Sequence, residues 1–159
     1  MDNYVRFGEN EEFLQLEKSV WIFYINEEKV HELRENSGKW MYFFYDISLA
    51  ETLCKKAIEQ DVVVECKHSN ELGMMLNRNG QGVCCFYVNG DDYAAHKRVI
   101  GFFIENNMIR KTKAGKYYNI SFKYDDQTRA GEYQDSGFEA ELHLADLMDL
   151  ETGEYRPPF

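Results

Sequence analysis

Proline is almost absent from this sequence: Pro157 and Pro158, beside the last residue, are the only two. No stretch rich in proline, glycine or serine separates one part of the chain from another, and no internal repeat is visible. A length of 159 residues, 44% of them hydrophobic, suits one domain with its own core. We therefore expect a single domain over 1–159, with an acidic N-terminal extension at 1–18 and an acidic C-terminal segment at 134–159.

Long apolar runs and paired cysteine motifs are also missing. No segment approaches the roughly 18 consecutive apolar residues of a membrane-spanning helix, and the first residues lack the basic and apolar parts of a signal peptide. The cysteines form no C-x-x-C motif and lie in apolar surroundings, as reduced core thiols do: they are Cys54, Cys66, Cys84 and Cys85. These features predict a cytoplasmic protein that has no disulfides and binds no membrane.

Basic residues are too few for a general nucleic-acid binder. The formal net charge is −10, whereas binding to nucleic acid depends on neutralising phosphates with Lys and Arg. The acids gather toward the two ends, and the middle, 61–124, carries 9 bases against 6 acids. The charge pattern favours a protein partner with a basic surface, and it leaves room for a local site that holds one phosphorylated group.

Apolar runs alternate with amphipathic stretches along the chain. Strands are expected at 19–25, 39–45, 61–68, 82–89 and 117–124, with helices at 48–60 and from Asp91 to about 107. Asp46 and Ser48 are candidate N-caps for the first of these helices, and Asp91 and Asp92 for the second. This alternation predicts a sheet with helices packed mainly on one face.

Several short motifs, in this order, resemble a known family. They are Gly38-Lys39-Trp40-Met41, Cys66-Lys67, and Lys123-Tyr124-Asp125-x-x-Thr128-x-x-Gly131-x-Tyr133. Over about 19–133 the chain resembles the family of basophilic leukaemia-expressed proteins, which carries the label phosphothreonine lyase and is similar in fold to the cap-binding translation factor 4E. The resemblance implies an α+β fold: a single curved, largely antiparallel sheet backed by helices on one face, with a ligand cleft on the concave side.

Cations and one aromatic residue in these motifs form the candidate ligand site. Lys39 beside Trp40 places a positive charge next to an aromatic face, which suits a stacked, phosphorylated base, and arginine suits bidentate contacts to phosphate. The residues expected to converge on one cleft are Lys39, Trp40, Lys67, Lys123, Thr128 and Arg129. The alternative is that Trp40 belongs to the core and the cations form a solvated rim.

No catalytic or metal constellation stands out. An elimination reaction would need a base and an acid on the same side of a substrate, but Lys67 and His68 are adjacent in an expected strand and should point to opposite faces. The four histidines have no metal-ligand spacing. We therefore expect no metal and no cofactor, and we leave open whether the basic loop at 110–116 binds an anion.

Three functions remain, in order of preference. The first is a non-catalytic binding protein that acts on a macromolecular partner, in the manner of an inhibitor or an immunity protein, through acids that include Asp146, Asp149 and Glu151. The second is a binder of a nucleotide or a phosphorylated small molecule in the cleft. The third is an enzyme that resembles a phosphothreonine lyase.

Overall fold

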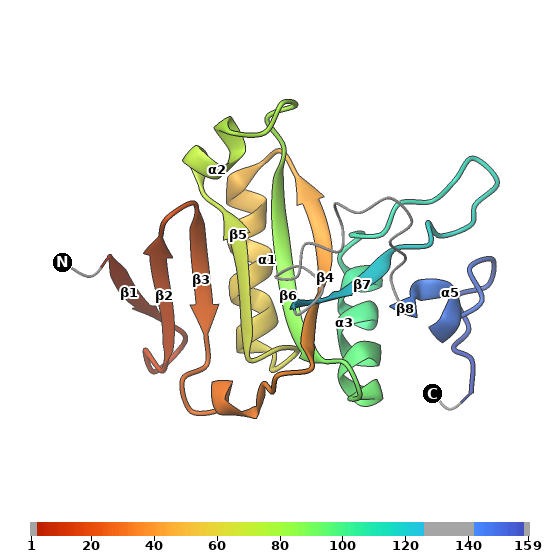
Figure 1. Cartoon of the computed structure of the whole chain (residues 1–159), viewed down its shortest axis with the longest axis horizontal. Coiled ribbons are helices and arrows are strands. Elements are labelled where there is room, and N and C mark those ends of the chain that lie inside the picture. Colours follow the sequence, from red (N-terminus) through yellow and green to blue (C-terminus); the bar gives the residue numbers. More distant parts are fainter. Residues whose placement is uncertain (1–2, 126–141, 158–159) are drawn as a thin grey trace. The chain divides into compact units, whose positions relative to one another are not determined.

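The structure is a computed structural model of the chain, and it describes residues 3–125 and 142–157. Its elements, in chain order, are β1 (Tyr4–Phe7), β2 (Phe13–Lys18), β3 (Trp21–Ile25), η1 (Val30–Glu32), β4 (Ser37–Phe44), α1 (Ile47–Glu59), β5 (Glu65–Ser69), α2 (Glu71–Met75), β6 (Gly82–Asn89), α3 (Tyr93–Glu105), β7 (Ser121–Tyr124), β8 (Leu142–His143) and α5 (Leu144–Leu147) (Figure 1).

Contacts within the chain divide it into two compact units. Unit 1 consists of Met1–Leu33 and Met41–Tyr87, and unit 2 consists of Arg34–Trp40 and Val88–Phe159. The boundary falls inside β4 and β6. The hydrogen-bonded strand order is β1-β2-β3-β5-β6-β4-β7-β8, and the strand pairs with a defined register in the described residues are antiparallel. The predicted α+β class, a largely antiparallel sheet backed by helices, is confirmed.

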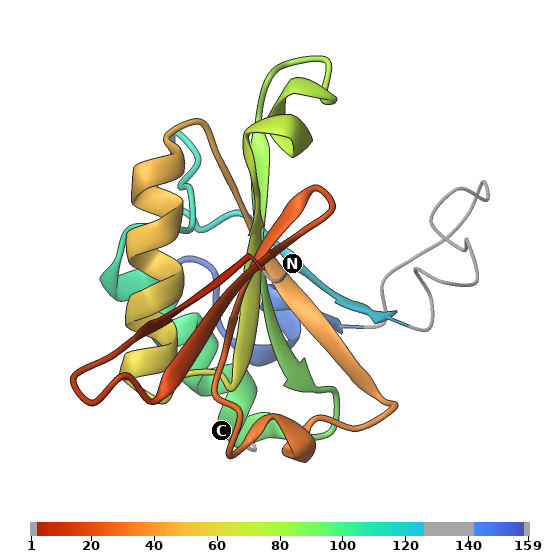
Figure 2. The ribbon, with the colours of Figure 1, turned by 90° about the vertical axis from the view of Figure 1, so that its left-hand side faces the viewer.

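In unit 1, helix α1 lies against one face of the sheet formed by β3 and β5 (Figure 2). The Asp46 carboxylate begins the helix by accepting hydrogen bonds from backbone N–H groups of the first turn, which otherwise have no partner. The Cys66 thiol of β5 donates to the Cys54 carbonyl oxygen of α1 at 3.5 Å. The helix buries an apolar stripe on this face: Ala50, Leu53, Cys54, Ala57 and Ile58.

In unit 2, helix α3 packs on the strand residues Trp40 and Phe122. Asp92 caps the helix, because its carboxylate accepts from the Ala95 backbone N–H at 3.1 Å. The His96 ring meets the Phe122 ring at a centroid distance of 4.7 Å and the Trp40 ring at 5.9 Å, both edge to face. These aromatic contacts form the centre of the unit 2 core.

The N-terminal residues differ from the prediction of an acidic extension at 1–18. Strand β2 pairs along its length with β1 on one side and β3 on the other. Leu16 lies opposite Phe23 and Leu14 lies opposite Ile25, so these apolar side chains share one face of the hairpin. Their cross-strand contacts favour the strand in spite of the acidic residues nearby.

Two predicted strands are shorter than expected. The prediction for 61–68 becomes β5 from Glu65, because Asp61 has a left-handed φ of 57° and Val62 donates its N–H to the Ala57 carbonyl at the end of α1. The prediction for 117–124 becomes β7 from Ser121, since Tyr117 and Tyr118 donate to loop carbonyls instead. Helices α1 and α3 lie where the sequence predicts them.

Candidate functional site

The candidate site is the face of unit 1 that α1 leaves uncovered. Side chains alternate between the two faces of a strand. Cys66 contacts α1, so its neighbour Lys67 projects from the other face. Lys67 pairs with Phe23 of β3 on one side and with Cys85 of β6 on the other.

Aromatic rings surround the Lys67 ammonium on this open face. Its Nζ lies 3.9 Å from the centroid of the Trp21 ring, 5.4 Å from that of Phe23 and 5.8 Å from that of Tyr87. Each ring face carries negative potential, and a cation at such a distance gains about 0.5–2 kcal/mol, depending on how far it is desolvated. We call Trp21, Phe23, Lys67 and Tyr87 the aromatic-lysine cluster.

The cluster combines accessible aromatic surface with a fixed positive charge. Trp21, Phe23 and Lys67 are half-buried, whereas Tyr87 is buried. Glu65 is two residues before Lys67 on the same face and is also half-buried, so a carboxylate lies at the edge of the cluster. The arrangement can stack a planar ring and attract a negative group at the same place.

His68, next to Lys67 in sequence, belongs to the opposite face and to the core. Its Nδ1 is 2.8 Å from the Ser69 carbonyl oxygen, and its Nε2 is 2.8 Å from the Tyr24 hydroxyl. A carbonyl only accepts, so Nδ1 carries the proton and Nε2 accepts from Tyr24. Burial lowers the pKa of His68. Lys67 and His68 therefore do not face one substrate.

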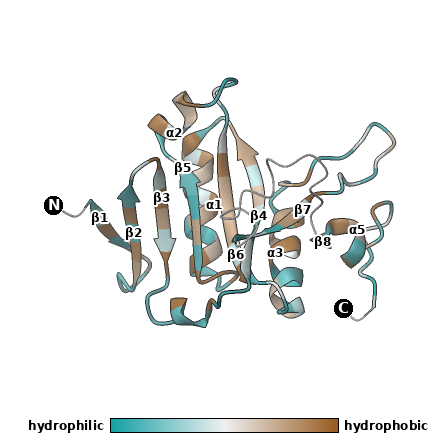
Figure 3. Cartoon of the chain, viewed as in Figure 1, coloured by the Kyte–Doolittle hydropathy of each residue, from teal (hydrophilic) through white to brown (hydrophobic). Residues whose placement is uncertain are grey.

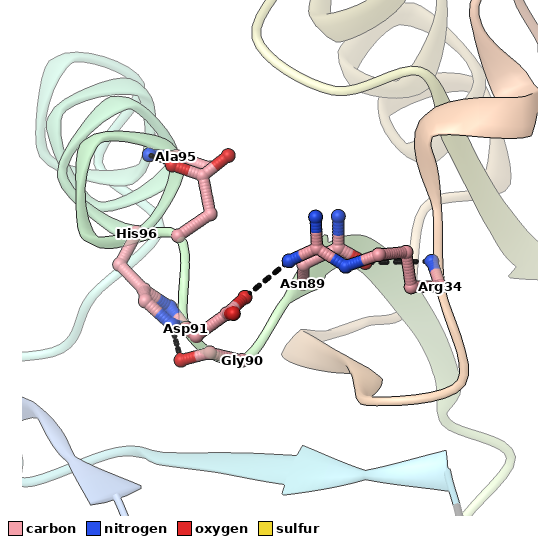
Figure 4. Close-up of polar contacts among 7 residues, drawn as sticks. Arg34, Asn89, Gly90, Asp91, Ala95 and His96 are labelled. Atoms are coloured by element: carbon pink, nitrogen blue, oxygen red, sulfur yellow. Dashed lines mark hydrogen bonds and ion pairs between the residues drawn. The ribbon is translucent and has the colours of Figure 1, made fainter.

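Trp40 is a core residue, which corrects its predicted place in the ligand site. Its ring is fully buried, and its Nε1 donates to His96 Nδ1 at 3.0 Å. The other nitrogen of His96 donates to the Gly90 carbonyl oxygen at 2.9 Å (Figure 4). Because both nitrogens are used by the neutral ring and the site is buried, the pKa of His96 is lowered.

The loop before α3 is fixed by polar contacts that link it to Arg34. The Arg34 backbone N–H donates to the Asn89 side-chain oxygen at 2.7 Å, and its guanidinium donates to Asp91 at 2.5 Å (Figure 4). A hydrogen bond from the Asn36 side chain, together with the Arg34 charge, lowers the pKa of Asp91. These contacts fix the loop that leads into α3, and we assign them a structural role.

Lys39 and Lys123 of the predicted set lie together in unit 2. They are directly opposite each other in the antiparallel register of β4 and β7, and Lys39 Nζ is 3.2 Å from Asp125 Oδ1. Lys67 belongs to unit 1, so its convergence with these two lysines stays a prediction. Thr128 and Arg129 lie outside the described residues.

Of the predicted partner-binding acids, Asp146 and Glu151 are exposed and Asp149 is half-buried, and all three have local contacts. The Asp146 carboxylate accepts from the His143 N–H at 2.8 Å at the start of α5, and Asp149 accepts from the N–H groups of Glu151 and Thr152. These backbone hydrogen bonds lower the pKa of Asp149. Glu151 is well exposed, 3.9 Å from the Lys116 ammonium. Binding of a partner by these acids stays a prediction.

Within 3–125 and 142–157, no group of three or more His, Cys, Asp or Glu side chains is placed to hold a metal ion. The four cysteines form no disulfide and are buried. In the same residues no helix is long and apolar enough to cross a membrane.

Sequence reasoning identified Lys67 but missed its aromatic neighbours Trp21, Phe23 and Tyr87. Trp21 and Phe23 are separated from Lys67 by more than 40 residues, and only the β3–β5 register brings them together. The signal available in the sequence is weak: Trp21, Phe23 and Ile25 occupy every second position of an apolar run, which places them on one face of a strand.

Comparisons with known proteins support the fold alone. No protein-family profile matches the chain, and no curated protein matches it in sequence. In structure, the chain is similar to schistosome eIF4E, solved as a complex with m7GpppA and 4E-BP, with a TM-score of 0.53 and 7% sequence identity. The match covers 77% of this chain and 69% of that one. The chain therefore has an eIF4E-like fold.

Proposed function

Starting from this fold, we propose that the chain is a non-catalytic binding protein whose open sheet face holds a nucleotide or a similar phosphorylated aromatic ligand. The observation that carries the proposal is the aromatic-lysine cluster, with the Lys67 ammonium 3.9 Å from the Trp21 ring centroid. A base would stack on the accessible aromatic surface, and its phosphate would pair with Lys67. We place this activity in the cytoplasm, where the four cysteines, which form no disulfide, remain reduced.

Lys67 also defines which base the cluster would accept. The eIF4E structure contains m7GpppA, whose 7-methylated guanine carries a positive charge. In this chain the Lys67 ammonium lies 3.9 Å from the centroid of the Trp21 ring, and a cationic base stacked on the same ring would be repelled by it. The proposed ligand is therefore a nucleotide with a neutral base, and methylation of the base at N7 should weaken binding.

Tryptophan fluorescence provides a direct test. Trp21 is half-buried on the open face, whereas Trp40 is fully buried, so a stacked base should quench only Trp21. In titrations of the native protein, GMP and AMP, which have neutral bases, should quench Trp21 fluorescence at lower concentrations than 7-methyl-GMP does. Trp21→Phe should abolish the quenching, and Lys67→Met should weaken binding roughly tenfold, the value of one charge-assisted hydrogen bond.

The matched control for Lys67→Met is Lys56→Met. Lys56 is an exposed lysine of α1, so the change removes the same charge from the opposite side of unit 1. It should leave the affinity unchanged. No quenching by any nucleotide, or equal loss in the two lysine variants, would reject the site.

A second candidate function, binding of a protein partner with a basic surface, rests on helix α2. Its apolar side chains are exposed, namely Leu72 by 52%, Met75 by 78% and the adjoining Leu76 by 70%, and Figure 3 shows the apolar colour of this helix. Exposed apolar clusters on a folded protein commonly mark interfaces, and methionine adapts to varied partners. The net charge of −10 favours a basic partner.

The anchoring of α2 strengthens this second candidate. The buried Asn70 side chain accepts from the Gly73 N–H at 2.9 Å and donates to Glu17 and to the Ser19 carbonyl, each at 3.0 Å. A Cβ on Gly73 would come within 2.7 Å of the Val20 carbonyl oxygen, so the helix lies tightly against the β2–β3 turn. The apolar side chains are thus presented on a fixed support.

Affinity capture with matched variants tests the partner. The native chain and the exposed-residue control Val5→Ser should retain the same basic protein from a lysate, and Met75→Ser/Leu76→Ser should lose it. Capture that is equal for all three proteins would reject α2 as the docking surface.

The third candidate, an elimination enzyme, follows from the resemblance to the basophilic leukaemia-expressed family and its phosphothreonine lyase label. Lys67 and His68 lie on opposite faces of β5, so they cannot serve as base and acid for one substrate. We rank this candidate last. Incubation with a phosphothreonine peptide would support it if phosphate and a dehydrated peptide appeared together.

A further inference from the structure

We infer that the ligand of the aromatic-lysine cluster is a short single-stranded oligonucleotide, with one base on Trp21 and the next base on Phe43. The inference rests on the proposed nucleotide site and adds a second base to it. RNA and DNA single strands share the base and phosphodiester chemistry that such a site recognises.

Phe43 is an exposed aromatic residue on the same face of unit 1 as Lys67. The next residue, Phe44, is buried, and its ring meets the His68 ring edge to face at a centroid distance of 5.9 Å. His68 lies on the α1 side of the sheet, so alternation along β4 directs Phe43 to the other side. The Phe43 residue is 54% exposed, and its ring therefore offers surface on which a base can stack.

Trp21 and Phe43 are too far apart for one base to cover both. The strands of unit 1 lie in the order β3, β5, β6 and β4 (Figure 1). The two aromatic residues are thus three strand spacings apart, which is about 14 Å at the usual distance between hydrogen-bonded strands. Two successive bases of a single strand can reach both rings, and aromatic residues on the faces of other sheets bind two or three RNA bases in this way.

Lys67 lies between the two aromatic residues in the strand order. It belongs to β5, which neighbours β3 and is separated from β4 by β6, and its Nζ is 3.9 Å from the Trp21 ring centroid. The phosphodiester that joins the two bases would pass this ammonium. The phosphate contact of the proposed nucleotide site is therefore kept in the longer ligand.

Helix α2 borders the path of the strand. Ser69 is directly opposite Trp21 in the β3–β5 register and is two residues after Lys67, so it lies on the same face. A Cβ on Gly73 of α2 would lie 3.2 Å from the Ser69 Cβ, which places the helix over Ser69. The oligonucleotide would therefore run beside α2, on its Lys67 side.

Stacking has to supply most of the affinity, because charge does not favour a polyanion. The chain has a formal net charge of −10, and the aromatic-lysine cluster contains one lysine. Neutralisation of one phosphate on a single strand gives a slope of about −0.7 for the logarithm of affinity against the logarithm of salt concentration. We expect this shallow salt dependence for the native chain.

Titration of Trp21 fluorescence with AMP and with the 5′-phosphorylated dinucleotide pApA tests the second base. The native chain should bind pApA roughly tenfold more tightly than AMP, as expected for one additional stacked base. Phe43→Ala should remove this gain and leave the affinity for AMP unchanged, whereas Phe43→Tyr, which keeps a ring, should retain it. The control is Tyr118→Ala, which removes a ring that is 46% exposed in unit 2 and should change neither affinity.

The outcomes separate this inference from the proposed function. Equal affinities for AMP and pApA, a gain that survives Phe43→Ala, or a salt slope of several units would overturn the second base and leave the nucleotide site in place. No quenching of Trp21 by either ligand would reject the nucleotide site and the second base together. The comparison of AMP with pApA uses the native chain, so it decides the question even if a variant does not fold.

The deoxy counterpart of pApA identifies the source of the single strand. Tighter binding of pApA would show that the site reads the 2′-hydroxyl group and selects RNA. Equal affinity would indicate recognition of the bases and the phosphodiester that RNA and DNA share.

Discussion

Lys67 and His68 are adjacent in β5, yet they lie in opposite environments. The Lys67 side chain lies on the open face beside the rings of Trp21 and Phe23, whereas His68 is buried under α1 with both ring nitrogens hydrogen-bonded. The same alternation occurs in unit 2, where Lys39 precedes the buried Trp40. On the helix-covered side, His68 and His96 are hydrogen-bonded through both ring nitrogens, as buried polar groups need to be, whereas the opposite face carries lysines.

The largest expected effect is a loss of stability when Trp40, on the helix-covered face, is replaced by a small residue. Trp40→Ala removes a fully buried ring and leaves His96 Nδ1 without its donor. The free energy of unfolding, measured by urea denaturation, should fall by about 3–5 kcal/mol. Trp21→Ala on the open face should cost clearly less. Equal losses for the two tryptophans would break the distinction between the faces.

The second effect is a loss of stability in acid. The pKa values of His68 and His96 are lowered in the folded state by burial, so below about pH 6.5 the unfolded chain takes up protons that the folded chain refuses. Stability from these histidines is therefore complete above about pH 6.5 and decreases as the pH falls toward their folded pKa values, by at most about 1.4 kcal/mol per pH unit for each histidine.

Urea denaturation between about pH 7.5 and 5, the range around the ordinary histidine pKa, measures this slope. His68→Gln and His96→Gln should each flatten it, even though each variant is less stable at neutral pH. His31→Gln is the control, because His31 is exposed, and it should keep the native slope. A native slope that all three variants share would show that other groups govern acid sensitivity.

A smaller effect is expected on the open face at Lys67. Lys67→Met replaces the ammonium above Trp21 by an apolar chain of similar length, so the free energy of unfolding should change by no more than about 1 kcal/mol. Nucleotide quenching of Trp21 should nevertheless be weakened. A large loss of stability would mean that the cluster is a structural contact instead of a binding site.

Local sequence patterns predicted most of the helices and strands. Asp46 and Asp92 were expected to cap α1 and α3, and the apolar runs at β4 and β6 were expected to be buried strands. Strands β1 and β2 were missed, because Leu14 and Leu16 of β2 gain their apolar partners only through pairing with Ile25 and Phe23 of β3, respectively. Acidic composition alone does not reveal that register.

The candidate site was less predictable, since it depends on contacts across strands. Lys39 and Trp40 are neighbours in sequence, and their adjacency suggested a shared site, but alternation sends them to opposite faces. Lys67 was recognised as a possible anion ligand, whereas Trp21 became its partner only through the register of β3 and β5. Sequence shows which residues carry charge or aromatic surface, and pairing decides which of them meet.

The last comparison is between two acidic residues near the C-terminal end, Asp146 and Glu151. The Asp146 carboxylate accepts a hydrogen bond from the His143 N–H, so Asp146→Ala should lower the free energy of unfolding by about 0.5–2 kcal/mol, the usual value of a lost cap.

Glu151 and Lys116 are both exposed and 3.9 Å apart, and Glu151→Lys should change stability by less than about 1 kcal/mol. If the acidic segment binds a basic partner, however, Glu151→Lys should slow association at low salt, because reversing an exposed charge alters long-range attraction. Stopped-flow mixing with the captured partner measures the association rate. An unchanged rate would show that Glu151 does not contribute to the attraction of the partner.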